Sequence, residues 1–183
     1  MKKILGKRFF NRDTETVAKE LLGKFLVRKI GNKEIPVMIV ETEAYDGPHD
    51  RASHAFLGKT QRTEVMFGHP GNFYVYLCYG MYFMLNIVTR EYGYPAAVLI
   101  RGAAYHGGEE KKVILDGPGK ITKFLGVDKN LNRKKSEKQS MLWIEDRGLK
   151  THKNNIRKTF RVGVGYAGPL WSVKKLRFFL DTH

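Results

Sequence analysis

The chain has 183 residues, of which 42% are hydrophobic and 12% aromatic, and this suits one compact domain with a buried core. Lysine and arginine total 33 against 18 aspartate and glutamate residues, so the formal net charge is +15 at pH 7. This excess favours a polyanionic partner such as nucleic acid. The single cysteine, Cys78, excludes an internal disulfide and a cysteine-based zinc site.

The sequence predicts neither a secretory signal nor a membrane span. Lys7 and Arg8 interrupt the short apolar stretch near the N-terminus, which is not typical of a signal peptide. The longest apolar segment, residues 73–88, contains several tyrosines, Asn86 and a central Gly80, which argues against a membrane helix. We therefore expect a monomer that is neither secreted nor bound to a membrane, located in the bacterial cytoplasm with the nucleoid or in a eukaryotic nucleus.

The N-terminal third predicts a helix, a hairpin and a long loop. Asp13 or Thr14 can cap a helix over Glu15–Leu22, in which apolar residues recur at helical spacing. Two runs rich in β-branched residues, Lys24–Ile30 and Ile35–Ala44, flank a Gly31-Asn32 turn and predict a β-hairpin. Residues 45–70 lack periodicity, and long ordered loops of this kind are often functional.

The remaining residues predict further strands and one short helix. The expected strands are Phe73–Cys78, Met81–Thr89, Ala96–Arg101, Met141–Ile144, Phe160–Val164 and Leu176–Leu180. Pro118 is placed at the start of a helix that continues over Ile121–Leu125, and the charged residues 128–138 are expected to be solvated. We expect one α+β domain over residues 1–183, with a curved, mostly antiparallel sheet, surrounding helices and a protruding hairpin.

Two carboxylates lie where the second strand of the first hairpin runs into the long loop. The alternation of side chains along a strand places Glu41, Glu43 and Tyr45 on one face. A glutamate half buried at a strand end has a raised pKa, which suits a general base that deprotonates water. The alternative is that these residues are ordinary edge-strand charges that face solvent.

Histidines in and beside the long loop raise the question of a metal site. His49, Asp50, His54 and His69 match no closed ligand motif, since His49 and His54 are five residues apart and no CxxC pair accompanies them. We expect no metal site, and we expect His54 to form an aromatic or hydrogen-bonding wall.

The segment from Phe73 to Phe83 predicts a hairpin with an aromatic tip. Tyr74 and Tyr76 lie on one face, and Gly80 supplies the positive φ of the turn, so that Tyr79 stands at the outermost point. In the functional interpretation Tyr79 is a wedge that enters a nucleic-acid groove and fills the gap left by an unstacked nucleotide. The alternative is a tip that is buried under a neighbouring loop as part of the core.

Residues 117–120 combine free backbone N–H groups at a helix start with a lysine. Gly119 and Lys120 can therefore hold one phosphate. The spacing is not that of a nucleotide-binding loop, and a simple helix entry explains the pattern equally well.

Several short motifs follow one another along the chain. They are Arg8-Phe9-Phe10, Leu21-Leu22-Gly23-Lys24, Glu41-Thr42-Glu43-Ala44-Tyr45, Asp50-Arg51-Ala52-Ser53-His54, Val65-Met66-Phe67-Gly68, Tyr74-Val75-Tyr76, Tyr79-Gly80-Met81-Tyr82, Asn86, Val98-Leu99-Ile100-Arg101, residues 117–120 and Arg161-Val162-Gly163-Val164-Gly165. In this series the chain resembles the alkyladenine (3-methyladenine) DNA glycosylase family. The resemblance spans nearly the whole chain, and several motifs in one order are more specific than any one of them.

The resemblance implies base excision repair of damaged DNA. The enzyme would bind duplex DNA, flip an alkylated or deaminated purine into a pocket and hydrolyse its N-glycosidic bond without a cofactor. The family's substrates would be 3-methyladenine, 7-methylguanine, hypoxanthine and ethenoadenine. The roles implied are general base for Glu43, a place beside the attacking water for Arg101, pocket walls for Tyr45, His54 and Tyr76, exclusion of the guanine amine for Asn86, and intercalation for Tyr79.

Two other functions remain open at this point. One is a non-catalytic nucleic-acid-binding module that uses its tyrosines as a stacking platform, and the other is a bifunctional glycosylase whose lysine forms a Schiff base. The residues alone do not decide between Glu41 and Glu43 as the base. Gln61 stands where the family pattern has proline, so the shape of that loop is not carried over.

Overall fold

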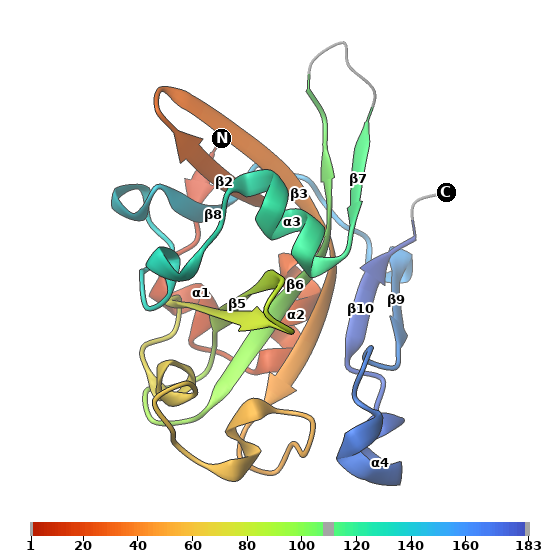
Figure 1. Ribbon diagram of the computed structural model, residues 1–183. Coiled ribbons are helices and arrows are strands. Elements are labelled where there is room, and N and C mark those ends of the chain that lie inside the picture. Colours follow the sequence, from red (N-terminus) through yellow and green to blue (C-terminus); the bar gives the residue numbers. More distant parts are fainter. Residues whose placement is uncertain (1, 108–111, 182–183) are drawn as a thin grey trace.

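The computed structural model describes residues 2–107 and 112–181, whose strands form one antiparallel sheet (Figure 1). The strands are β1 (Lys3–Ile4), β2 (Phe25–Ile30), β3 (Lys33–Asp46), β4 (Phe73–Cys78), β5 (Tyr82–Val88), β6 (Ala96–Tyr105), β7 (Val113–Asp116), β8 (Leu142–Asp146), β9 (Ile156–Thr159) and β10 (Arg177–Leu180). The helices in the described ranges are α1 (Lys7–Phe10), α2 (Thr14–Leu21), α3 (Pro118–Leu125) and α4 (Gly168–Ser172). The expected α+β class is confirmed.

The strand β3 organises the sheet. The order is β1-β8-β2-β3-β6-β5-β4, with β10 paired to β3 and β9, and β7 paired to β6. The first half of β3 pairs with β2, its later residues Glu41–Glu43 pair with β10, and β6 runs along its other side. A strand with hydrogen-bonded partners on both sides is not an edge strand. The carboxylates of β3 therefore do not lie on a free sheet edge.

The helix α2 covers one face of this central region. Asp13 caps it by accepting a hydrogen bond from the Thr16 N–H at 2.8 Å, and its apolar stripe, which includes Val17 and Ala18, is fully buried. Thr42 on β3 points toward the helix and donates its hydroxyl to the Ala18 carbonyl at 2.9 Å. Because side chains alternate along a strand, the neighbours of Thr42 point to the opposite face.

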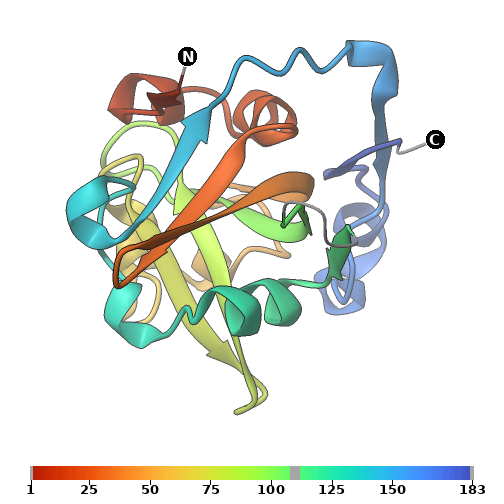
Figure 2. The ribbon, with the colours of Figure 1, turned by 90° about the horizontal axis from the view of Figure 1, so that it is seen from above.

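The hairpin predicted between Phe73 and Phe83 is confirmed as the pair β4–β5, and it projects from the body of the molecule (Figure 2). Tyr79 and Gly80 form the turn with φ values of 49° and 69°, which is the pattern of the tight turn that matches strand twist. Tyr79 is 91% exposed at the tip. The alternative of a buried tip is wrong.

The predicted strand Phe160–Val164 is wrong, because the strand β9 ends at Thr159 and the chain then turns. Arg161 is drawn inward to a buried partner, and Gly163 has a φ of 73°, which a continuing strand does not allow. The short elements β1, α1, β7 and α4 were not expected, since stretches of two to five residues carry little periodicity.

The charged segment 128–138 is not simply solvated. Leu131 is buried, and the backbone of the segment bonds to β4, where the Phe73 N–H donates to the Lys134 carbonyl at 2.7 Å. The expectation of a solvated stretch therefore holds for many of its side chains and fails for its backbone. Among the described residues, the helices are all too short to cross a membrane.

Candidate active site

Four neighbouring strands bring polar and aromatic side chains onto the face of the sheet opposite α2. Glu43 lies opposite Leu99, Leu99 opposite Asn86, and Asn86 opposite Tyr74, from β3 through β6 and β5 to β4. Directly opposed residues in antiparallel strands share a face. Above this row lies a cavity of about 280 Å³.

Loops close the cavity from the sides. Its lining comes from the four strands, from Ala52, Ser53 and His54 after β3, from Met66, from Pro118 at the start of α3, and from Val162, Gly163, Val164 and Tyr166 after β9. The strand residues that line it are Glu43, Tyr45, Tyr74, Tyr76, Met84, Asn86, Ala97, Leu99 and Arg101, with Cys78 and Tyr79 at the hairpin end. All the residues predicted for the catalytic and base-binding roles thus meet at one cavity.

Glu43 is the acidic group of this cavity. Its side chain is fully buried and is held by two hydrogen bonds and one ion pair: the Val162 N–H donates to Oε1 at 3.0 Å, the Tyr45 hydroxyl donates to Oε2 at 2.8 Å, and Arg101 Nε lies 3.3 Å from Oε1. Burial raises the pKa of Glu43 above its ordinary value, and the two hydrogen bonds together with the charges of Arg101 and Arg177 oppose this rise. A carboxylate in this setting accepts a proton more readily than one in water.

Glu41 is on the same strand but is engaged elsewhere. Its Oε1 pairs with Arg101 Nε at 3.0 Å and with Arg177 Nε at 2.5 Å, and it does not line the cavity. The two carboxylates that the sequence left undecided are therefore separated by their surroundings. The interpretation of both as solvent-facing edge charges is wrong for Glu43.

Two β-bulges produce this arrangement. The pairing of β3 with β6 passes from Ile39–Ala103 to Glu41–Gly102 and then to Thr42–Ile100, so Val40 and Arg101 each have no direct partner. A bulge re-aims the extra side chain and twists the strand locally. Here the bulge directs Arg101 between Glu41 and Glu43.

The aromatic wall is built from β4 and the loop after β3. The rings of Tyr74 and Tyr76 lie 5.1 Å apart, and the His54 ring meets the Tyr76 ring edge-on at 4.6 Å. His54 Nδ1 lies 3.1 Å from the Tyr74 hydroxyl. Burial, with a smaller contribution from the Arg62 guanidinium, lowers the pKa of His54 to about 4, so its ring is neutral at pH 7.

The comparisons with known proteins agree with this geometry. The profile of the family described as methylpurine-DNA glycosylase matches residues 8–183. The chain belongs to the methylpurine-DNA glycosylase family. It is a DNA glycosylase, and its substrate is damaged DNA.

Curated relatives support the assignment over nearly full length. A protein of Legionella pneumophila is 44% identical over 186 residues, covering 100% of this chain and 97% of its own. A protein of Borreliella afzelii is 43% identical over 180 residues, with 97% and 96% covered, and one of Clostridium perfringens is 42% identical over 182 residues, with 89% of each covered. All three are assigned by name to the 3-methyladenine DNA glycosylases.

A buried ion pair that the sequence did not reveal supports the cavity of this methylpurine-DNA glycosylase family member. Arg161 donates to both Asp50 carboxylate oxygens, at 2.5 and 2.9 Å, and to the Ala44 carbonyl at 2.9 Å, and both side chains of the pair are fully buried. The Arg161 guanidinium also lies 4.7 Å from the centre of the Tyr45 ring. Asp50 is thus the partner of Arg161. The only sign of this role in the sequence was that Asp50 is an acidic residue in the long loop expected to be functional.

Of the remaining predicted residues, Asn86 lies at the floor of the cavity, and Gly119 and Lys120 lie outside its lining. Asn86 is buried, and its Nδ2 donates to the Tyr74 carbonyl at 3.1 Å, which fixes its carboxamide at the floor. Lys120 is exposed and pairs with Asp116 at 2.5 Å, and Gly119 packs so closely on Tyr82 that an added Cβ would lie 2.8 Å from the ring. The structure does not bring Lys120 into the cavity.

The histidines of the long loop do not converge. Among residues 2–107 and 112–181, no group of three or more His, Cys, Asp or Glu side chains is arranged to hold a metal ion. His69 instead packs its ring on Tyr92 at 4.8 Å.

Proposed function

We propose that this DNA glycosylase flips an alkylated or deaminated purine nucleotide out of duplex DNA, holds the base in the cavity above the sheet and hydrolyses its N-glycosidic bond. The substrates proposed are 3-methyladenine, 7-methylguanine, hypoxanthine and ethenoadenine. The observation that carries the proposal is a fully buried glutamate, Glu43, in a cavity walled by aromatic rings. At about 280 Å³ the cavity lies near the lower limit of about 300 Å³ for small-molecule pockets, which suits a single base.

The chemistry follows from the surroundings of Glu43. Its carboxylate takes one proton from a water, the water oxygen bonds to the sugar C1′, and the electrons of the breaking C1′–N bond leave with the base. The products are an abasic site and the purine: a cationic alkylated base leaves neutral, a neutral base such as hypoxanthine leaves as an anion that takes up a proton from solvent, and Glu43 returns its proton to solvent. The carboxylate also stabilises positive charge that develops on the sugar, an electrostatic contribution that does not require proton transfer.

The walls suit the binding of a flipped purine. Tyr45, Tyr76 and His54 offer ring faces and edges on which a base can stack, and stacking of this kind contributes about 1–3 kcal/mol per base. Because His54 is neutral, a cationic alkylated purine meets no positive charge from this ring. The hydrogen bond to the Tyr74 carbonyl fixes the carboxamide of Asn86, and we assign to it the exclusion of the exocyclic amine of undamaged guanine.

Tyr79 and the basic surface serve DNA binding in this proposal. The exposed ring of Tyr79 fills the position that the flipped nucleotide vacates, which offsets part of an unstacking cost of a few kcal/mol. Gly119 and Lys120 contact a phosphate, and Lys120 exchanges its partner Asp116 for the phosphate when DNA binds.

The proposed enzyme is monofunctional. Among the described residues that line the cavity, Arg101 is the one cationic side chain, and an arginine does not lose the proton that a Schiff-base nucleophile must lose. Borohydride treatment during turnover should therefore trap no covalent protein–DNA adduct. An adduct would support the bifunctional alternative instead.

The decisive experiment is single-turnover release of the base from duplex oligonucleotides that each carry one of the four lesions, read as strand cleavage by alkali. Glu43→Gln should bind the same duplexes and lose about 10²–10⁴-fold in release rate, the usual contribution of a general base. Glu41→Gln is the matched control and should lose less, because Glu41 does not line the cavity.

Two outcomes would contradict the proposal. Release by Glu43→Gln at the unmodified rate would remove Glu43 from the chemistry. Binding of every lesion duplex without release by the unmodified protein would favour a non-catalytic binding module.

A further inference from the structure

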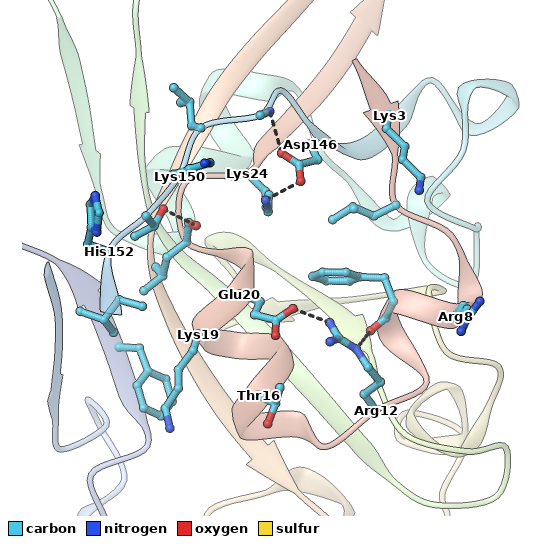
Figure 3. A pocket seen from close by; sticks show the side chains of 18 of the residues that line it. Lys3, Arg8, Arg12, Thr16, Lys19, Glu20, Lys24, Asp146, Lys150 and His152 are labelled. Carbon is cyan, nitrogen blue, oxygen red and sulfur yellow. Dashed lines mark hydrogen bonds and ion pairs between the residues drawn. The ribbon is translucent and has the colours of Figure 1, made fainter. Parts of the chain in front are cut away.

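A groove of about 1600 Å³ lies apart from the cavity. We call it the basic groove. It lies between β1, α1 and α2 on one side and the segment that follows β8, together with β9, on the other. Figure 3 shows basic side chains from these elements arranged around it.

The basic groove carries a strong positive charge. Seven lysine and arginine side chains line it against two carboxylates, so it holds an excess of five positive charges out of the +15 of the chain. Both carboxylates are already neutralised, Glu20 by Arg12 at 2.8 Å and Asp146 by Lys24 at 2.6 Å.

Four other cations of the basic groove have no such partner. Lys3, Arg8, Lys150 and Lys158 are exposed and form no ion pair with any residue in the described part of the chain. Like charges gathered around a hollow repel one another, and an anionic ligand relieves this repulsion.

DNA bound at the cavity does not supply that anion. The basic groove shares no lining residue with the cavity, and α2 together with the β3–β6 part of the sheet stands between them. Figure 2 shows α1 and α2 on the side of the molecule opposite the tip of the β4–β5 hairpin. A duplex read by Tyr79 therefore leaves the basic groove free.

The floor of the basic groove is apolar, which limits the chemistry of the ligand. Ile4, Phe9 and Ile156 are partly exposed there and Leu149 is 50% exposed, and the Arg12 guanidinium stands 4.5 Å from the centre of the Phe9 ring. A nucleic-acid backbone matches the cations but offers nothing to the floor. A peptide with both acidic and apolar side chains matches the two features together.

We propose that the basic groove is a docking site for a peptide segment of a partner protein in which acidic side chains alternate with large apolar ones. The acidic groups pair with Lys3, Arg8, Lys150 and Lys158, and the apolar groups cover the floor. The partner binds while the cavity on the other face holds DNA.

The probe for the test is a fluorescein-labelled peptide of twelve residues in which Glu alternates with Leu, measured by fluorescence anisotropy with the full chain. The comparison probes are a Glu–Ser peptide of the same charge, and a single strand and a duplex of DNA of twelve nucleotides per strand. The groove variant is Lys3→Glu with Lys150→Glu, and the matched control is Lys33→Glu with Lys112→Glu, two exposed lysines that line neither hollow.

The Glu–Leu peptide should bind the unmodified protein and the control variant with equal affinity. It should bind the groove variant about tenfold more weakly. Both variants should keep the urea midpoint of the unmodified protein, because the four lysines are exposed. Saturation with lesion duplex should leave peptide binding in place.

The proposal is overturned if the Glu–Leu peptide fails to bind or binds all three proteins alike. It is overturned equally if the Glu–Ser peptide binds as tightly, which would leave the floor without a role. Tighter, groove-dependent binding of either DNA probe would assign the basic groove to nucleic acid. These readouts do not involve base release, so they stand apart from the test of Glu43.

Discussion

Replacement of Asp50 by Asn should destabilise the protein far more than a single surface charge would. Asp50→Asn keeps the size and shape of the side chain but removes the charge that balances Arg161, and both partners are fully buried. Removal of one partner from a buried ion pair costs about 3–5 kcal/mol, because the remaining charge has no counterion. For a chain of this length the expected fall in melting temperature is about 6–20 °C.

The matched control is Asp116→Asn, which breaks the exposed pair with Lys120. Exposed pairs contribute little to stability because water and salt screen them, so this variant should unfold close to the unmodified protein in urea. The reasoning is refuted if Asp50→Asn and Asp116→Asn shift the urea midpoint equally. Equal shifts would mean that Arg161 reaches water or another anion once Asp50 is neutral.

The same substitution should alter the pH dependence of base release. Arg161 anchors the loop that places the Val162 N–H on Glu43, and this hydrogen bond lowers the pKa of Glu43. Loosening the loop therefore raises that pKa further and moves the acid limb of the release rate to higher pH, measured in single turnover. A lower rate with an unmoved acid limb would indicate a structural role alone.

Three further predictions concern single residues. The His54 ring should remain neutral down to about pH 4 in an NMR titration, and Arg62→Gln should raise its pKa, whereas an ordinary midpoint near 6.5 would contradict the burial seen here. Tyr79→Gly should raise the free energy of unfolding by about 1 kcal/mol, because Tyr79 has a φ of 49°, and Tyr79→Ala should not. Glu43→Gln should stabilise the protein at pH 7 and leave it unchanged at pH 3, because a raised carboxyl pKa removes stability as the pH rises through it.

The residues alone predicted the elements that have strong periodicity. The helix α2, the β2–β3 hairpin and the β4–β5 hairpin were predicted because apolar spacing and turn residues agree there. The strand at Phe160–Val164 was wrong, because an alternating apolar pattern also describes a loop whose Arg161 turns inward to Asp50. That contact joins residues 111 positions apart, and no local pattern encodes it.

The choice between Glu41 and Glu43 shows why pattern alone did not fix the base. Both residues occupy the same face of β3, and period-2 alternation treats them alike. The distinction comes from the paired bulges, which place Arg101 between the carboxylates, and from β10, which brings Arg177 to Glu41. Neither a bulge nor a partner strand from the end of the chain is visible in the residues around position 41.

The resulting difference is electrostatic. The side chain of Glu41 is 15% exposed and forms ion pairs with Arg101 and Arg177. The side chain of Glu43 is fully buried, and two of its three contacts are hydrogen bonds from neutral donors. Burial outweighs the hydrogen bonds and arginine charges that lower the pKa of Glu43, so this pKa stays raised and Glu43 remains a proton acceptor. Arg177 contributes least to lowering the pKa of Glu43, because the sheet directs its guanidinium to Glu41.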